Sequence, residues 1–120
     1  MRILLADDDR IVVTLVAKLL RDKGHEVVPV FDAMQAVMFA LRTPQPDLVI
    51  LDINMPGGSG IEALKRLRAS LKTALVPVLV LSGTIDPNMP ELVKSLGADG
   101  FLRKPVDPAA LSEALARFGG

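Results

Sequence analysis

Two adjacent aspartates and a third, distant one each stand directly after a short apolar run. Asp7 and Asp8 follow residues 3–6, and Asp52 follows residues 48–51. If the carboxylates converge, two unit charges about 4 Å apart repel by about 4 kcal/mol at an effective dielectric constant of about 20. Three such groups stay ionised only beside a cation, and Mg²⁺ is the hard divalent ion most often found with phosphate. The run 7–9 alone favours a solvated acidic loop, in which Asp9 faces solvent or caps the first helix.

Asp52 ends a run that is otherwise Leu, Val, Ile and Leu. A carboxylate in that place is costly unless it is paired or used. One interpretation is an aspartate that only caps the following turn. The other is a nucleophile toward phosphorus, with a metal ion that neutralises phosphoryl charge and orients an in-line transfer.

Two further polar residues stand at expected strand ends. The hydroxyl of Ser82 can hydrogen-bond a phosphoryl oxygen, and Gly83 beside it leaves room for close backbone approach. Lys104 supplies a positive charge and precedes Pro105, a bond that can be cis. Each residue alone is typical of an ordinary turn. The Gly-rich loop 55–60 keeps the approach to Asp52 open, but it lacks the Gly-Lys-Ser/Thr ending of a P-loop.

Hydrophobic periodicity and turn residues place these groups on alternating strands and helices. Expected strands are 3–6, 26–30, 47–52, 75–82 and 99–103; expected helices are 11–20, 33–41, 61–71, a short one ending at 96, and about 108–118. The expected buried face of the first helix consists of Ile11, Leu15, Val16, Leu19 and Leu20. Gly24 and Gly97 are expected helix stops, and Asp107 is an expected N-cap before Pro108.

This alternation predicts an α/β fold, a single doubly wound parallel sheet of five strands with helices on both faces. Ligands of such sheets bind beyond the carboxyl ends of the strands. The expected strands end at or next to the chemically capable residues Asp7, Asp8, Asp52, Ser82 and Lys104. We therefore expect these side chains to line one cleft.

Composition narrows the class of protein. The 120 residues, half of them hydrophobic, fit one packed domain, residues 1–120. A net charge of zero gives no basic face for nucleic acid, and the absence of cysteine excludes disulfides and thiol catalysis. The apolar runs are too short for a membrane span, and we expect no secretory leader, because residues 1–5 run directly into acids. These features favour a cytoplasmic protein, in which His25 is a loop or strand-edge residue.

The chain resembles response-regulator receiver domains of two-component signalling, including the chemotaxis receivers. The resemblance covers essentially all of it and rests on the blocks ILLADDD (3–9), DLVILDINMP (47–56), Gly60, PVLVLSG (77–83) and GADGFLRKP (97–105). Jointly these blocks and their separations are a specific signal, although each block alone is weak. The resemblance implies a flavodoxin-like fold with sheet order 2-1-3-4-5.

The resemblance also implies residue roles. Asp52 would be the phosphoacceptor, and Mg²⁺ would be held by Asp7, Asp8, Asp52 and the backbone carbonyl of Asn54. Ser82 would follow the phosphoryl group, and Lys104 would pair with it through a cis bond to Pro105. Phe101 would be the switch aromatic, which as Phe rather than Tyr would act by burial alone. Asn54 and Thr84 occupy positions that tune phosphoryl loss in this family.

The implied partners are a histidine kinase or histidine phosphotransfer protein as phosphoryl donor, and a downstream protein on the face formed by the fourth helix, fifth strand and fifth helix. Pro87 and Pro90 leave the start of that helix uncertain. We expect a monomer or weak dimer, and no nucleic-acid binding by this domain. Met34, Met38, Met55 and Met89 are expected to be packing residues. The sequence leaves open whether this is a stand-alone regulator or part of a longer protein.

Two alternatives remain open. A metal-dependent phosphohydrolase with an Asp nucleophile usually has a second Asp two residues later as general acid, where this chain has Asn54. The other alternative is a degenerate receiver that acts only by protein docking, against which the intact set of site residues argues. We expect a phosphoacceptor switch with at most slow self-catalysed turnover rather than an enzyme.

Overall fold

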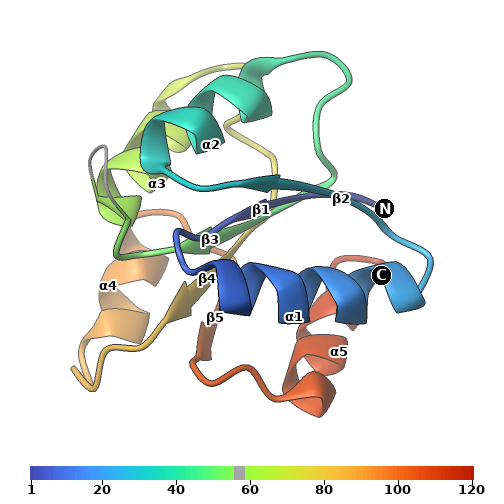
Figure 1. Ribbon diagram of the computed structural model, residues 1–120. Coiled ribbons are helices and arrows are strands. Elements are labelled where there is room, and N and C mark those ends of the chain that lie inside the picture. The colour runs from blue at the N-terminus through green and yellow to red at the C-terminus, as the bar shows by residue number, and fades with distance from the viewer. Residues whose placement is uncertain (56–58) are drawn as a thin grey trace.

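The computed structural model describes residues 1–55 and 59–120. Five strands alternate with five helices along the chain (Figure 1). Their bounds are β1 Arg2–Ala6, α1 Arg10–Asp22, β2 Glu26–Val30, α2 Ala33–Leu41, β3 Leu48–Asp52, α3 Gly60–Ala69, β4 Val78–Ser82, α4 Met89–Ser95, β5 Gly100–Arg103 and α5 Pro108–Ala116.

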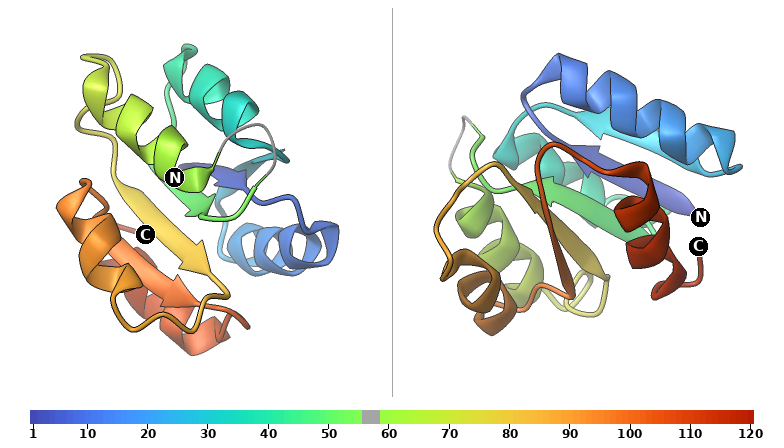
Figure 2. Two further views of the ribbon diagram at one scale, coloured as in Figure 1. Left: turned by 90° about the vertical axis from the view of Figure 1, so that its left-hand side faces the viewer. Right: turned by 90° about the horizontal axis from the view of Figure 1, so that it is seen from below.

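The strands form one parallel sheet in the order β2-β1-β3-β4-β5, which confirms the predicted topology. Successive side chains of a strand point to opposite faces. Leu4 of β1 and Val49 of β3 therefore pack against α2, α3 and α4, whereas Leu5 and Ile50 pack against α1 and α5. The views in Figure 2 show the helices on the two sides of the sheet. Strands β3 and β4 are buried throughout, as continuous apolar runs require.

Several predicted boundaries are confirmed by their caps. Gly24 follows α1 with φ of 88°, and Gly97 follows α4 with φ of 104°, a backbone region that favours glycine. The Asp107 side chain accepts a hydrogen bond from the Ala110 N–H and caps α5. The start of α4, which the prolines left uncertain, lies at Met89.

The predicted buried face of α1 is partly wrong. Val16 and Leu20 are buried, but Ile11 and Leu15 are 81 % and 51 % exposed. The helix instead buries Val13 and Ala17 beside Val16 and Leu20. Met34 and Met38 of α2 are exposed too, which corrects their assignment to packing, while Met55 is buried and Met89 packs at the edge of the core.

The segment between α3 and β4 also differs from the prediction. Helix α3 ends at Ala69 and β4 begins only at Val78, leaving Leu71 and Leu75 exposed. The intervening turns are held by Arg68, whose guanidinium donates to the carbonyls of Thr73 (3.2 Å) and Val76 (2.7 Å). These bonds join residues that are five and eight positions apart. Hydrophobic periodicity does not reveal such contacts, so the predicted end of α3 and the predicted start of β4 are wrong.

The topology brings the carboxyl ends of all five strands to one edge. Ala6 pairs with Leu51, Asp52 with Leu81, and Ser82 with Arg103. The residues that follow β1, β3, β4 and β5 are therefore neighbours in space although they are far apart in sequence. Among the described residues, no helix combines the length and apolar character needed to cross a lipid bilayer.

Candidate functional site

The three predicted aspartates meet at the carboxyl edge of the sheet. Asp7, Asp8 and Asp52 each offer a carboxylate oxygen, and these oxygens lie within 4.8 Å of one another. Asp7 and Asp52 are buried, whereas Asp8 is exposed at the mouth of the cluster. The cluster combines two shielded oxygen ligands with one that solvent can reach.

Asp7 is held by the backbone around it. Its N–H donates to the Val30 carbonyl at 3.1 Å, and its Oδ1 accepts from the Asp9 N–H at 2.9 Å. Asp9 turns away and caps α1 by accepting from the N–H groups of Ile11 and Val12, which confirms one of its two expected roles. Asp7 Oδ2 is buried and accepts no hydrogen bond of regular geometry within 1–55 and 59–120, although the Lys104 ammonium lies 2.7 Å from it.

Asp52 ends β3 with its carboxylate close to the same ammonium. Its Oδ1 lies 3.5 Å from Lys104 Nζ and accepts a long hydrogen bond, 3.4 Å, from the Asn54 N–H. Burial and the charge of Asp7 raise the pKa of Asp52 to about 6, although Lys104 opposes this shift. One ammonium therefore compensates two buried carboxylates only partly, and a further cation would keep Asp52 fully ionised.

Lys104 is positioned by the strand that precedes it. Its backbone N–H donates to the Ser82 carbonyl at 2.8 Å, and its bond to Pro105 is cis, as the sequence suggested. Burial by itself would lower the pKa of Lys104, but its close contacts with the negative charges of Asp7 and Asp52 outweigh burial and raise it. The ammonium therefore stays charged at neutral pH.

Ser82 ends β4 at the same edge of the sheet, and Phe101 lies on the neighbouring strand β5, paired with Val80. Ser82 is fully buried at the end of β4, and its hydroxyl oxygen accepts from the Thr84 N–H at 3.1 Å. Phe101 is half-buried on β5 and packs against the core shared by α2, α3 and α4. Asn54 is exposed directly after the acidic strand end. Residues 56–58, half of the Gly-rich loop 55–60, lie outside the described residues.

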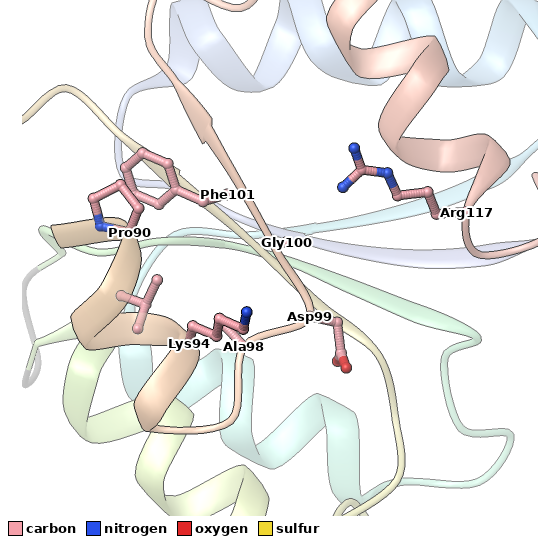
Figure 3. Close-up of a pocket in the computed structure, with 8 residues that line it drawn as sticks. Pro90, Lys94, Ala98, Asp99, Gly100, Phe101 and Arg117 are labelled. Carbon is pink, nitrogen blue, oxygen red and sulfur yellow. The ribbon is translucent and has the colours of Figure 1, made fainter.

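A groove of about 270 Å³ lies apart from this cluster, between α4, β5 and α5. Figure 3 shows the residues that line it, among them Pro90 and Lys94 of α4, Phe101 of β5, and Arg117 at the end of α5. It coincides with the face that the sequence analysis expects to bind a downstream protein. Phe101 therefore belongs both to this groove and to the strand that leads to Lys104.

A backbone approach too close for any side chain occurs at Gly60, the first residue of α3. The expected room at Gly83 for an approach to a phosphoryl oxygen stays a prediction. A Cβ on Gly60 would collide with the Asp52 carbonyl and lie 2.5 Å from Ile53 Cα, and the Gly60 N–H donates to the Ile53 carbonyl at 2.8 Å. A Cβ on Gly83 would meet no described atom within 4 Å. Gly60 is thus the residue that lets α3 start directly against the strand end carrying Asp52.

Gly60→Ala is expected to destabilise the protein by about 2 kcal/mol, because backbone must shift to admit the methyl group. Urea denaturation measures the loss. Gly83→Ala, whose added methyl group would meet no described atom within 4 Å, is the matched control and should leave the free energy of unfolding unchanged. Equal effects of the two variants would contradict this account.

Comparison with known proteins agrees with this geometry. Residues 3–116 match the response regulator receiver domain family. The sensory/regulatory protein RpfC of Xanthomonas campestris pv. campestris is 38 % identical over 118 residues, which are 97 % of this chain but 16 % of RpfC. The two-component response regulator ORR6 of Oryza sativa subsp. japonica is 33 % identical over 98 % of this chain and 71 % of that protein.

Solved structures show the same fold. The receiver domain of the sensor histidine kinase PA1611 from Pseudomonas aeruginosa PAO1, with a magnesium ion in its active-site cleft, superposes with a TM-score of 0.89, 30 % identity and coverage of 99 % of this chain and 98 % of that one. Vibrio cholerae chemotaxis protein CheY4 gives a TM-score of 0.88 with 32 % identity, covering 98 % of this chain and 97 % of that one. The chain therefore belongs to the response regulator receiver domain family of two-component signalling.

Proposed function

We propose that Asp52 accepts a phosphoryl group from the phosphohistidine of a histidine kinase or histidine phosphotransfer protein. The observation that carries the proposal is a buried Asp52, with a pKa of about 6, that lies beside both the Asp7–Asp8 pair and the Lys104 ammonium. Such a carboxylate is ionised but poorly solvated at neutral pH, and so is suited to attack an electrophilic phosphorus atom.

The donor set fits Mg²⁺. Asp7, Asp8 and Asp52 supply hard oxygen ligands on one side of the cleft, and the buried Oδ2 of Asp7 still lacks a regular hydrogen bond from the described residues. We assign the ion to these carboxylates and to the backbone carbonyl of the exposed Asn54. When bound, Mg²⁺ neutralises charge on the phosphoryl oxygens and favours an in-line transfer.

The positions of the side chains support the following transfer. An Asp52 carboxylate oxygen forms a bond to phosphorus while the bond from phosphorus to the donor's histidine nitrogen breaks, and the departing imidazole takes up a proton. Lys104 stays protonated and compensates the new phosphoryl charge. The Ser82 hydroxyl donates to a phosphoryl oxygen once it turns from the Thr84 N–H toward Asp52.

The proposed output is a change at the α4–β5–α5 groove. Movement of Ser82 toward the phosphoryl group opens space into which the half-buried Phe101 ring can move. Since Phe101 also lines the groove of Figure 3, its position alters the surface offered to a downstream protein. The chain is thus proposed to act as a phosphoacceptor switch rather than as a multiple-turnover enzyme.

Incubation with acetyl phosphate and Mg²⁺ tests the proposal directly. The protein should gain the mass of one phosphoryl group, located by peptide mapping to the segment containing Asp52. Hydroxylamine should remove it, because hydroxylamine cleaves acyl phosphates and leaves serine phosphates intact. A stable phosphate on a serine, or no gain in mass, would overturn the assignment, and rapid turnover of a small phosphomonoester would favour a phosphohydrolase.

Mg²⁺ is expected to stabilise the protein against urea. At ten times its dissociation constant, an ion that binds only the folded state adds about 1.4 kcal/mol to the free energy of unfolding. Asp8→Asn should lose most of this gain, because it removes the solvent-accessible ligand of the cluster. Asp22→Asn, on the exposed end of α1, is the control and should keep it; a gain retained by Asp8→Asn would place the ion elsewhere.

A further inference from the structure

The Arg103 side chain contacts both the Phe101 ring and the connection between β4 and α4. Arg103 is the last residue of β5, is exposed, and lies two residues after Phe101, so both side chains leave the same face of the strand. Its guanidinium carbon lies 5.3 Å from the centroid of the Phe101 ring. The same guanidinium donates to the carbonyl oxygen of Thr84 and, at 3.3 Å, to that of Asp86.

The two carbonyls belong to the segment that holds the Ser82 hydroxyl. The Thr84 N–H donates to Ser82 Oγ at 3.1 Å, and the Asp86 N–H donates to Thr84 Oγ1 at 3.2 Å. Arg103 thus binds the carbonyl groups of a short turn, residues 84–86, and an N–H group of the same turn is bonded to the Ser82 hydroxyl. A planar guanidinium suits this arrangement, because its fork presents several donors at fixed angles.

This arrangement opposes the movement that the proposed function requires. For Ser82 to donate to a phosphoryl oxygen on Asp52, its bond with the Thr84 N–H must break or the turn must follow it. For Phe101 to move inward, its ring must leave the Arg103 guanidinium. Both movements cost contacts that Arg103 makes in the unphosphorylated protein.

We propose that Arg103 is a positioning residue that tethers the β4–α4 connection and Phe101 in the resting arrangement and so weakens the response to phosphorylation. This inference rests on the proposed function of Asp52. By linkage, an interaction present only in the resting state raises the stability of the free protein and lowers its affinity for a ligand that selects the other state.

The test uses the whole chain and beryllium fluoride with Mg²⁺, a phosphoryl analogue that binds a carboxylate. Arg103→Met removes the fork but keeps most of the apolar stem, and Arg103→Lys keeps the charge without the fork. Both variants should bind the analogue about 3- to 10-fold more tightly than the parent, the effect expected of one or two partly exposed hydrogen bonds. Both variants should also melt at a lower temperature than the parent when no analogue is bound. Tighter binding together with lower stability distinguishes the loss of a tether from a general loss of structure, which would weaken binding as well.

Arg42→Met is the matched control, because Arg42 also stacks on a phenylalanine, with its guanidinium carbon 4.6 Å from the centroid of Phe39, but lies at the other end of α2 from the site. It should leave analogue affinity unchanged. Unchanged or weaker binding by Arg103→Met would overturn the tether. Parental binding by Arg103→Lys would overturn it too, by showing that charge alone matters. Failure of the parent to bind the analogue would instead overturn the proposed function, and with it this inference.

Discussion

Asp52→Asn is expected to take up no phosphoryl group from acetyl phosphate while the parent protein does. The neutral amide oxygen is a far weaker nucleophile than a carboxylate, so the initial rate should fall at least about 100-fold. Intact mass spectrometry over a time course measures it. The structure supports this expectation, because Asp52 ends β3 with Lys104 Nζ 3.5 Å from its carboxylate, where the ammonium can compensate the added phosphoryl charge.

Asp47→Asn provides the matched control for this loss. Asp47 directly precedes the same strand, at its opposite end, where its Oδ2 accepts from the Arg2 N–H at 2.7 Å. The substitution makes the same chemical change far from the cluster and should leave uptake at the parental rate. Equal uptake by Asp52→Asn and the parent would remove Asp52 from the reaction.

Asp52→Asn should also be more stable than the parent at neutral pH in Mg²⁺-free buffer. The pKa of Asp52 is about 6 in the folded protein against an ordinary value of 3.8, because burial and Asp7 disfavour the charge. Between these pH values the folded state holds more protons than the unfolded state, so the parent loses stability as pH rises. Above pH 7 the loss is nearly complete and amounts to about 3 kcal/mol.

Asn cannot ionise and so escapes this loss, while Asp7 keeps its contact with Lys104. Urea denaturation at pH 8 with a chelator should therefore show Asp52→Asn more stable than the parent by about 3 kcal/mol. The advantage should fade as the pH falls from 6 to 4. A variant less stable than the parent at pH 8 would show that Asp52 supports the fold rather than straining it.

The fold was predictable from sequence because its central strands are continuous apolar runs. A run such as 48–51, which is short and bounded by polar residues, is typical of a strand covered on both faces, and alternation with helices then leaves few topologies. The site followed from the fold, because the carboxyl ends of parallel strands share one edge and Asp7, Asp8 and Asp52 stand there. The carboxylates could be placed together without knowledge of any side-chain contact.

Features that depend on contacts between distant residues could not be predicted in this way. Helix α1 has apolar residues on two overlapping stripes, and only packing against β1, β2 and α5 selects Val13 over Ile11 and Leu15. Gly60 and Gly83 both follow strand ends, and only the path of β3 shows that Gly60 lacks space. The guanidinium of Arg103 donates to the carbonyls of Thr84 and Asp86, which precede it in the sequence by 19 and 17 residues.

Replacing Lys104 is expected to have the largest effect on stability. The Lys104 side chain is 20 % exposed, and its ammonium lies 2.7 Å from Asp7 Oδ2 and 3.5 Å from Asp52 Oδ1. The side chains of these two aspartates are 0 % and 4 % exposed. Lys104→Met leaves two buried carboxylates without this cation. Breaking a buried ion pair by removing one partner costs about 3 kcal/mol or more, so the variant should lose about that much at pH 8 in Mg²⁺-free buffer.

The dependence of this loss on pH and Mg²⁺ identifies its cause. Without Lys104 the pKa of Asp52 rises further, since the ammonium opposes its upward shift. The deficit should therefore be largest at high pH and shrink as acid protonates Asp52. Mg²⁺ should narrow it too, because a divalent ion in the cluster supplies the missing positive charge.

Lys18→Met is the control for loss of a lysine, since Lys18 pairs with Asp22 at 3.2 Å on the exposed face of α1. An exposed pair of this kind contributes little, so the change should stay within about 0.5 kcal/mol at every pH. Urea titrations of both variants at pH 5 and pH 8, with and without Mg²⁺, make the comparison. A Lys104→Met deficit that ignores both pH and Mg²⁺ would mean that the side chain stabilises the fold by packing alone, and that the two buried carboxylates do not depend on its charge.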